Sequence, residues 1–355
     1  QLTLERTQNL YLEFCLFDRS DQARNDTLSV VNMRGASYCG LSYSELNLGP
    51  NVVSGVGWLH HVNYGIDVWN DKATNTLPHH LTIHMNYIHG AAGWGVYLGG
   101  GQYLTVSENV FADISSDDIQ LGWVRDSVFR NNWGARKKYP YYSNKDYDHC
   151  DFIQTFSKTL DTPNNQYVGN VYMKGAYSVG APAQGLFGNG SHISNHLFEN
   201  NIILTNTPNA LMYAGSTQAY GNRCRYNTVL RLVDDFTFSD FKTATIRMPG
   251  AVEISRNVHC SMSGDSSMGL DGLLVLMKTG DYTASRAYYV NPVMAASFYD
   301  IRPVEGAVTH WAYGGDRQGA FQRFQDVIVG GKYPKTGPAA AAWKTWYDPK
   351  NQITA

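Results

Sequence analysis

The sequence predicts an all-β solenoid, a single-stranded parallel β-helix, on two observations. An Asn followed by mostly apolar residues recurs along the chain, and Asn63, Asn86, Asn109 and Asn132 are each separated by 23 residues. The segments between them hold short runs of alternating polarity and no helical period of useful length. A repeat of this length with a few short strands is typical of a solenoid whose coils bury their inward residues by stacking.

The strands and turns of each unit follow from the local pattern. The runs 81–85 and 104–107 alternate in polarity and are expected to be strands. Asn suits the turns because it tolerates the left-handed conformation, and its amide can hydrogen-bond the next Asn in a ladder. We expect the four Asn residues at the regular spacing to be stacked. Further members of the series, at gaps of 23 to 38 residues, are Asn9, Asn32, Asn170, Asn201, Asn227 and Asn257.

The domain organisation follows from the extent of the repeat. Residues 1–290 are expected to form one β-helix domain with a basic coil of 23 residues, continuing upstream of residue 1. Residues 291–355 are expected to form an irregular closing segment packed on the β-helix, where its aromatic residues cover a sheet edge or the end of the stack. These aromatic residues are Trp311, Phe321, Trp343 and Trp346.

Composition excludes several classes of partner. The net charge of -2 lacks the excess of Lys and Arg that phosphate binding needs, so nucleic acid is not an expected partner. No apolar run approaches the roughly 18 residues of a membrane span, so membrane insertion is not expected either. The five cysteines are widely spaced and contain no CxxC pair, which argues against a disulfide scaffold and a zinc site.

The chain resembles the pectin-lyase-like right-handed parallel β-helix superfamily, of the polysaccharide lyase, epimerase or phage tail-spike type. The Asn-based coil pattern carries the resemblance, and the closing segments 290–292, 300–306 and 319–321 strengthen it. The resemblance implies a right-handed β-helix, and it implies little about function because the superfamily contains enzymes and non-catalytic viral spikes. Neither an Asp-Pro-His-Glu nor an Arg-x-Pro-x-x-Arg segment is found, so no catalytic residue carries over by motif.

One insertion, after Asn132, differs from the charge-poor coils around it. It is rich in basic residues and tyrosines, and loops on a rigid scaffold often carry recognition. Arg and Lys suit carboxylate or sulfate groups and aromatic faces stack on sugars, so an acidic polysaccharide is the expected ligand; a solvated surface insertion is the alternative. The candidate binding residues of this loop are Arg136, Lys137, Lys138, Tyr141 and Tyr142.

Two related sequences bracket the loop. Ser115–Gln120 and His149–Gln154 align on Ile-Gln at an offset of 34 residues, which is one coil plus an insertion of 11, so they are expected to lie on successive coils. The 23-residue spacing also predicts that Trp94 lies next to Asp117, and Tyr97 next to Gln120, on the preceding coil. The strand alternation then turns Asp118 and Gln120 outward. We expect a glycan groove along this face, with Trp94, Tyr97, Gln120 and Gln154 as substrate-binding residues.

Asp117 and Asp151 have two interpretations. They share the inward parity of Ile119 and Ile153, so each carboxylate could accept hydrogen bonds from turn amides as a repeated corner device. The alternative is catalysis or metal binding.

Two chemistries fit the catalytic alternative. Hydrolysis of a glycosidic bond needs two carboxyl groups about 5 to 9.5 Å apart, which residues on the same or neighbouring coils provide. Lyase or epimerase chemistry needs a base, a group that neutralises the uronate carboxylate and an acid. The carboxyl candidates are Asp117, Asp118, Asp148 and Asp151; the base candidates are Lys145 and His149, the neutralisers Arg136 and Lys137, and the acids Tyr141, Tyr142 and Tyr147.

Histidines and a glycine run are given structural interpretations. The spacing of 23 residues places His84 above His61, and such a column could bind a transition metal, but no recognisable ligand triad supports a metal site. The run 99–101 lacks a following helix and is expected to be a turn. No cofactor is expected, and no motif indicates calcium.

The sequence thus favours a carbohydrate-active protein that binds and cleaves or modifies an acidic bacterial polysaccharide, as a lyase, epimerase or glycoside hydrolase. A phage tail-spike depolymerase satisfies the same pattern. The alternative is a non-enzymatic glycan receptor-binding or structural spike of a virion, for which a homotrimer is expected. Either interpretation places the protein outside the cell or on a virion surface.

Overall fold

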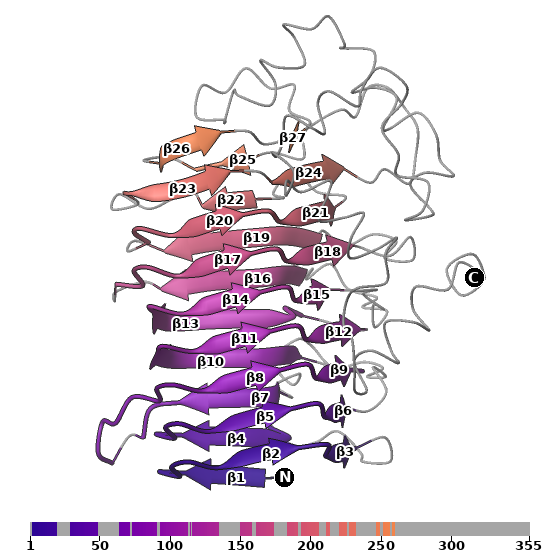
Figure 1. Cartoon of the computed structure of the whole chain (residues 1–355), viewed down its shortest axis with the longest axis vertical. Coiled ribbons are helices and arrows are strands. Elements are labelled where there is room, and N and C mark those ends of the chain that lie inside the picture. The colour runs from indigo at the N-terminus through magenta and orange to yellow at the C-terminus, as the bar shows by residue number, and fades with distance from the viewer. Residues whose placement is uncertain are drawn as a thin grey trace, which may run out of the picture.

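The chain forms a stack of coils in which each coil contributes one strand to each of three parallel sheets (Figure 1). Every strand lies between its counterparts from the neighbouring coils, and no helix occurs among the residues described. The computed structural model describes residues 2–19, 29–48, 64–71, 73–90, 93–112, 114, 116–134, 150–157, 161–173, 183–190, 193–205, 211–213, 220–225, 227–231, 246–248, 251–255 and 258–259. The predicted parallel β-helix is confirmed.

The three sheets, here called A, B and C, have nine strands each within the described residues. Sheet A holds β1 (Leu2–Glu5), β4 (Val31–Arg34), β7 (Tyr64–Trp69), β10 (Trp94–Gln102), β13 (Ile119–Arg125), β16 (Cys150–Ser157), β19 (Ala183–Gly190), β22 (Leu211–Tyr213) and β25 (Ile246–Arg247). Sheet B holds β2 (Tyr11–Glu13), β5 (Gly40–Ser42), β8 (Thr82–His84), β11 (Thr105–Ser107), β14 (Val128–Arg130), β17 (Gln166–Val168), β20 (Leu197–Glu199), β23 (Asn222–Arg225) and β26 (Ala251–Ser255). Sheet C holds β3 (Leu16–Asp18), β6 (Glu45–Asn47), β9 (Tyr87–His89), β12 (Val110–Ala112), β15 (Trp133–Gly134), β18 (Val171–Met173), β21 (Ile202–Thr205), β24 (Thr228–Arg231) and β27 (Val258–His259).

The core is the interior of the coils, where apolar strand residues face inward. In sheet B the residue at the centre of β5, β8, β11, β14, β17 and β20 is buried, as Ile83, Val106 and Phe129 are. The rings of Phe129, Tyr167 and Phe198 continue this column as a stack, with centroids 5.3 and 4.8 Å apart. Each fully buried side chain of this size contributes about 1.5 to 3 kcal/mol, so the stack of coils is held mainly by its interior.

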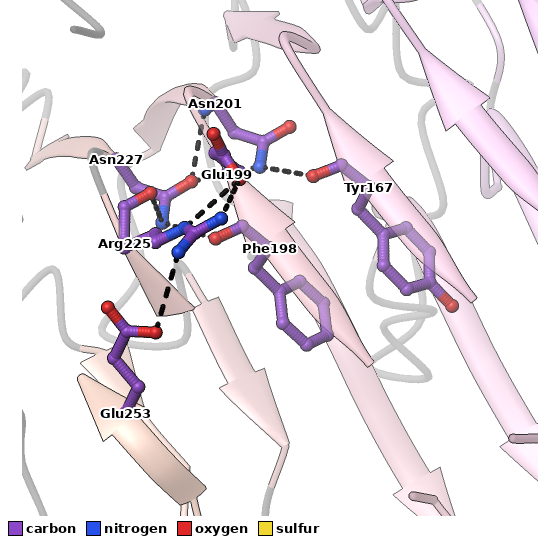
Figure 2. Close-up of polar contacts among 7 residues, drawn as sticks. All are labelled: Tyr167, Phe198, Glu199, Asn201, Arg225, Asn227 and Glu253. Atoms are coloured by element: carbon purple, nitrogen blue, oxygen red, sulfur yellow. Dashed lines mark hydrogen bonds and ion pairs between the residues drawn. The ribbon is translucent and has the colours of Figure 1, made fainter. Parts of the chain in front are cut away.

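The predicted asparagine ladder is present inside the turn between sheets B and C. The Oδ1 of Asn109 accepts the backbone N–H and the Nδ2–H of Asn86, each at 3.0 Å, and Asn132 does the same for Asn109. Each Nδ2 also donates to a backbone carbonyl of the preceding coil, as Asn132 does to Val106 at 2.9 Å. The ladder continues through Asn170, Asn201 and Asn227, and Figure 2 shows its last two members bonded to the Tyr167 and Phe198 carbonyls.

Two details of the predicted ladder need correction. The predicted stacking of Asn86 on Asn63 is wrong, since the ladder position in the coil before Asn86 belongs to Ser44, whose N–H donates to Asn86 Oδ1; Asn32 of the same repeat series lies in β4, in register with Asp67. The left-handed conformation belongs to the residue before Asn86, Asn109, Asn132, Asn170 and Asn201, such as Met85 with φ of 52°. The side-chain amide of each of these Asn residues therefore forms hydrogen bonds within the buried ladder, and the preceding residue adopts the turn conformation. Asn63 and Asn257 lie outside the described residues.

The histidine and glycine predictions are also corrected. His84 has Ser42 of β5 and Ser107 of β11 as its two neighbours in sheet B, so the predicted stacking of His84 on His61 is wrong. His61 itself lies outside the described residues. The run 99–101 is part of strand β10 and is not a turn.

Several boundaries fall outside the described residues. These include the predicted domain limit at residue 290 and the closing segment 291–355 with its aromatic side chains. Among the residues that the structure describes, none belongs to a helix of the length and apolar character that a bilayer crossing needs.

Candidate functional site

The candidate site lies on the outer face of sheet A, and a corner at the entrance of each strand determines which side chains reach it. Asp118 and Ile119 both point inward: Ile119 is fully buried, and a Cβ added to Gly134 of sheet C would lie 2.5 Å from the Asp118 Oδ2. Two successive inward residues reverse the alternation. The residue before them, Asp117, therefore turns to the outer face.

On this face, the Asp117 carboxylate forms hydrogen bonds to both the preceding and the following coil. Its Oδ2 accepts a hydrogen bond from the indole Nε1–H of Trp94 at 3.1 Å, and its Oδ1 accepts the backbone N–H of Asp151 at 2.9 Å. Both contacts confirm that Trp94, Asp117 and Asp151 lie on successive coils. The inward parity predicted for Asp117 is wrong, because a strict alternation does not survive the corner.

Asp118 is the clearest correction to the predicted site. Its side chain is fully buried and lies toward Gly134 in the interior of the coil, while its backbone N–H donates to the Asp151 carbonyl at 3.0 Å. A carboxyl group inside the solenoid cannot contact a ligand on the outer face. The prediction that Asp118 points outward failed for the same reason as the parity of Asp117.

Four aromatic residues form a cluster, here called the aromatic cluster, beside Asp117. They are Tyr64 and Trp69 of β7 and Trp94 and Tyr97 of β10. Tyr64 stacks on Trp94 with ring centroids 5.1 Å apart and an interplanar angle of 15°, and Tyr97 lies 5.1 Å from both Tyr64 and Trp69. All four side chains are partly exposed. The face thus offers contiguous ring surface to a ligand.

Gly99 and Gly100 of β10 leave space for the indole rings of the neighbouring strands. A Cβ on Gly99 would lie 2.6 to 2.8 Å from atoms of the Trp69 ring, and a Cβ on Gly100 would lie 2.7 Å from the Trp123 Nε1. Strand β10 therefore omits side chains where two indoles from neighbouring coils lie against it. The glycine run is a packing feature of the aromatic face.

A carboxylate that the sequence analysis missed, Asp67, lies under the aromatic cluster. It is in register with Tyr97, and its Oδ2 accepts a hydrogen bond from Ser29 Oγ at 3.1 Å. Burial raises its pKa to about 6, against the opposing effects of the Ser29 hydrogen bond and the Arg34 charge. Burial and the nearby Asp67 charge also raise the pKa of Tyr64 and of Tyr97.

The reason Asp67 was missed is its spacing. It lies 30 residues before Tyr97 rather than 23, because the coil between them is extended by a turn in which Asp71 and Thr76 pair. A constant period of 23 residues, counted back from Tyr97, leads to position 74 instead of Asp67.

Amide side chains extend the face beyond the aromatic cluster. Tyr97, Gln120 and Gln154 are in register on three successive coils, as predicted, and the Gln120 Nε2–H donates to Gln154 Oε1 at 2.9 Å. Gln184 follows Asp151 in the next coil, and Phe187 follows Gln154. The outer face of β7 to β19 therefore presents rings, carboxylates and amides along the axis of the stack.

The loop predicted to flank this face lies outside the described residues. This applies to the binding candidates Arg136, Lys137, Lys138, Tyr141 and Tyr142 and to the catalytic candidates Lys145 and His149. The segment that contains them joins β15 to β16. Among the described residues, no group of three or more His, Cys, Asp or Glu side chains has the geometry of a metal site.

The fold and the family comparison define the class of protein. Residues 64–229 match the family described as right handed beta helix region, the same residues that build the middle of the three parallel sheets. The chain is thus a right-handed parallel β-helix protein, as the sequence resemblance implied.

Three solved structures resemble the chain at low identity. PfbA, a surface adhesin of Streptococcus pneumoniae, has a TM-score of 0.49 and 12% identity, covering 64% of this chain and 56% of the adhesin. The Dettilon tailspike protein has 0.37 and 12%, covering 65% and 46%, and the GH136 lacto-N-biosidase from Eubacterium ramulus has 0.28 and 10%, covering 64% and 50%. The chain spans about half the length of each of them, and at this identity they do not indicate what it binds. No curated protein matches it in sequence.

Proposed function

We propose that this β-helix protein binds a polysaccharide along the outer face of sheet A, with the glycan crossing strands β7 to β19. The observation that carries the proposal is the aromatic cluster, partly exposed and packed over buried carboxylates. Aromatic faces stack on the apolar faces of sugar rings, and the partly exposed Gln120 amide bonds their hydroxyls. The axial order of these groups suits a linear chain.

The hydrogen bonds of Asp117 to Trp94 and to the Asp151 backbone, here called the Asp117 clamp, support a binding role. Because both carboxylate oxygens accept hydrogen bonds, one from Trp94 and one from the backbone of Asp151, Asp117 holds the indole in one orientation. A ring that is already fixed loses little conformational entropy when a sugar stacks on it. The clamp therefore preorganises the cluster.

The acidic nature of the ligand remains part of the proposal and depends on the basic loop. The described face contributes carboxylates and amides, and Arg34 is the cation beside Asp67. Further cations, Arg136, Lys137, Lys138 and Lys145, come from the loop between β15 and β16, and they would neutralise uronate or sulfate groups.

Cleavage or modification of the bound glycan is the second candidate function. It is favoured by two carboxylates on neighbouring coils, Asp117 and Asp151, since coils about 4.8 Å apart give the separation of a retaining glycosidase pair. Against it, Asp117 is 2% and Asp151 0% exposed. A glycan would have to displace the residues that cover them, so binding without turnover ranks first.

The site of action is proposed to be outside the cell or on a virion surface, where polysaccharides are met. We expect a homotrimer only if the protein is a virion spike. Light scattering of the purified chain measures the oligomeric state, and a monomer would exclude the spike alternative.

The test is a panel of alginate, pectate, hyaluronan and bacterial capsules. Binding, absorbance near 235 nm and reducing ends are measured together for the wild type, Tyr97→Ala and the control Tyr220→Ala, which removes an exposed ring outside the site. We expect at least one glycan to bind, and Tyr97→Ala to weaken binding about tenfold, the equivalent of roughly 1.4 kcal/mol of stacking. Wild-type binding by Tyr97→Ala, or no binding to any glycan, would refute the proposal.

Products separate the two candidate functions. Absorbance would mean β-elimination, and reducing ends without absorbance would mean hydrolysis, which Asp151→Asn should abolish. Binding without either product leaves a receptor-binding protein.

A further inference from the structure

The two turns that flank sheet B each hold an equivalent left-handed position in successive coils. In the turn from sheet A, this residue lies two positions before β2, β5, β8, β11, β14, β17 and β20 and one position before β23, with φ between 51° and 74°. In coil order these residues are Asn9, Tyr38, His80, Tyr103, Asp126, Asn164, Asn195 and Gly221. In the turn to sheet C they are Phe14, Tyr43, Met85, Glu108, Asn131, Gly169 and Asn200.

The residue type at both left-handed positions, here called the two columns, changes along the stack. The later coils mostly use Asn, Asp or Gly, the residues that adopt this conformation at low cost. The early coils use bulky side chains instead, and Tyr38, His80 and Tyr103 follow one another without interruption. Strain of this kind persists where the surrounding structure enforces it, and it is concentrated at functional sites.

These side chains form two walls of rings. On one edge of sheet B, Tyr38 stacks on His80 with centroids 4.7 Å apart and an angle of 16°, and His80 lies 5.0 Å from Tyr103. On the other edge, Phe14 stacks on Tyr43 at 5.2 Å. Tyr38 is 46%, Tyr103 49% and Phe14 73% exposed, so the rings do not serve the core.

The outward strand residues beside Tyr38, His80 and Tyr103 are small and, apart from His84, are Gly, Ser or Thr in β5, β8 and β11. Of these outward positions, Thr82 in β8 and Thr105 in β11 are partly exposed and offer hydroxyls, whereas Gly40 and Ser42 in β5 and Ser107 in β11 are buried. His84, the remaining outward residue, shares a hydrogen bond between its Nδ1 and Ser107 Oγ at 3.0 Å. Charged side chains occur in the preceding coil, where Glu13 of β2 is exposed, and in later coils, for example Arg225 between Glu199 and Glu253 (Figure 2).

We propose that this trough on sheet B, formed by the row of Tyr38, His80 and Tyr103 beside β5, β8 and β11, with Tyr43 as the facing ring in the coil of β5, is a second carbohydrate-binding site, selective for neutral sugars. The rings stack on the faces of sugar units, and the hydroxyl-bearing floor bonds to sugar hydroxyls. A floor without charge over β5 to β11 neither attracts a uronate nor repels a neutral hexose. The site uses another sheet and other residues than the proposed site on sheet A, so the two are independent.

The test exploits the strained turn positions. Isothermal titration of the full chain uses cellohexaose, maltohexaose and mannohexaose as neutral probes. We expect at least one to bind, and the double variant Tyr38→Asn/Tyr103→Asn to weaken it at least tenfold. The same variant should melt about 2 °C higher than the wild type, because Asn accepts the left-handed conformation more readily. A loss of binding in a more stable protein cannot be ascribed to misfolding.

Matched controls separate the outcomes. Glu108→Asn changes a left-handed residue of the second column that carries no ring, and it should leave binding unchanged. Tyr97→Ala, which tests the sheet A site, should also leave it unchanged. Equal affinity of wild type and double variant, or no probe bound below about 1 mM, would overturn the proposal. An oligomer that the double variant dissociates would overturn it too, since the trough would then be an interface between copies.

Discussion

The outer faces of sheets A and B share one backbone geometry and differ in where their aromatic residues come from. On sheet A the rings belong to the strands, pack on one another, and cover carboxylates such as Asp67 and Asp117. On sheet B the rings belong to the turns and border an uncharged floor. The first arrangement depends on tertiary packing and burial, while the second depends on local backbone strain. Substitutions should therefore act differently on the two faces.

The largest expected effect is common to both faces. Asn132→Ala removes the acceptor for the Asn109 N–H and Nδ2–H and the donor for the Val106 carbonyl, all in a buried turn. Unsatisfied buried groups cost about 1 to 3 kcal/mol each, so we expect a loss of roughly 3 kcal/mol in unfolding free energy. Urea denaturation measures it, with the exposed Gln166→Ala as control. A loss under 1 kcal/mol would show that the ladder contributes little.

The next effect is specific to sheet A and depends on pH. The raised pKa of Asp67 means that the folded state keeps the proton up to about pH 6, while the unfolded chain releases it near pH 4. The associated stability is present at pH below 4 and is lost as the pH rises through 6, by roughly 2 to 3 kcal/mol. Asp67→Asn should remove this loss, so its advantage over the wild type grows from pH 4 to pH 7. A difference that does not change with pH would contradict it.

A smaller effect isolates the Asp117 clamp. Trp94→Phe keeps a smaller ring in the aromatic cluster and removes the N–H that Asp117 Oδ2 accepts. A hydrogen bond to a buried carboxylate contributes about 1.5 to 3 kcal/mol, and we expect a loss at the lower end of that range. Thermal unfolding measures it, and Tyr97→Phe serves as the control that keeps all ring contacts. An unchanged melting temperature would mean that the clamp is not needed for stability.

The smallest effect belongs to the turns of sheet B and has the opposite sign. Phe14→Asn replaces an exposed ring at φ of 56° by a residue suited to that conformation. We expect a gain of about 0.5 kcal/mol after the loss of the Tyr43 stacking, measured by urea denaturation. A loss instead would place the stacking above the strain in the energetics of these turns.

Much of the fold was predictable because the repeat is one-dimensional. A solenoid coil contacts only its neighbours, so a constant spacing such as that of Asn86, Asn109 and Asn132 specifies stacking directly. The same logic placed Tyr97 at Gln120 and Trp94 at Asp117, and both placements are confirmed. It failed for Asp67, where an extended turn changes the coil length, and for Asp118, where the corner interrupts the alternation.

The sequence by itself determined the solenoid, the buried asparagine ladder and the row of outward residues on β10, β13 and β16, because each depends on spacing between adjacent coils. Only the tertiary structure decided that Asp118 lies inside and Asp117 outside, that Asp67 is buried under aromatic rings, and that the rings of Phe14 and Tyr38 border sheet B. Corners, burial and turn conformation arise from the packing of three sheets around one core, and a one-dimensional period does not contain them.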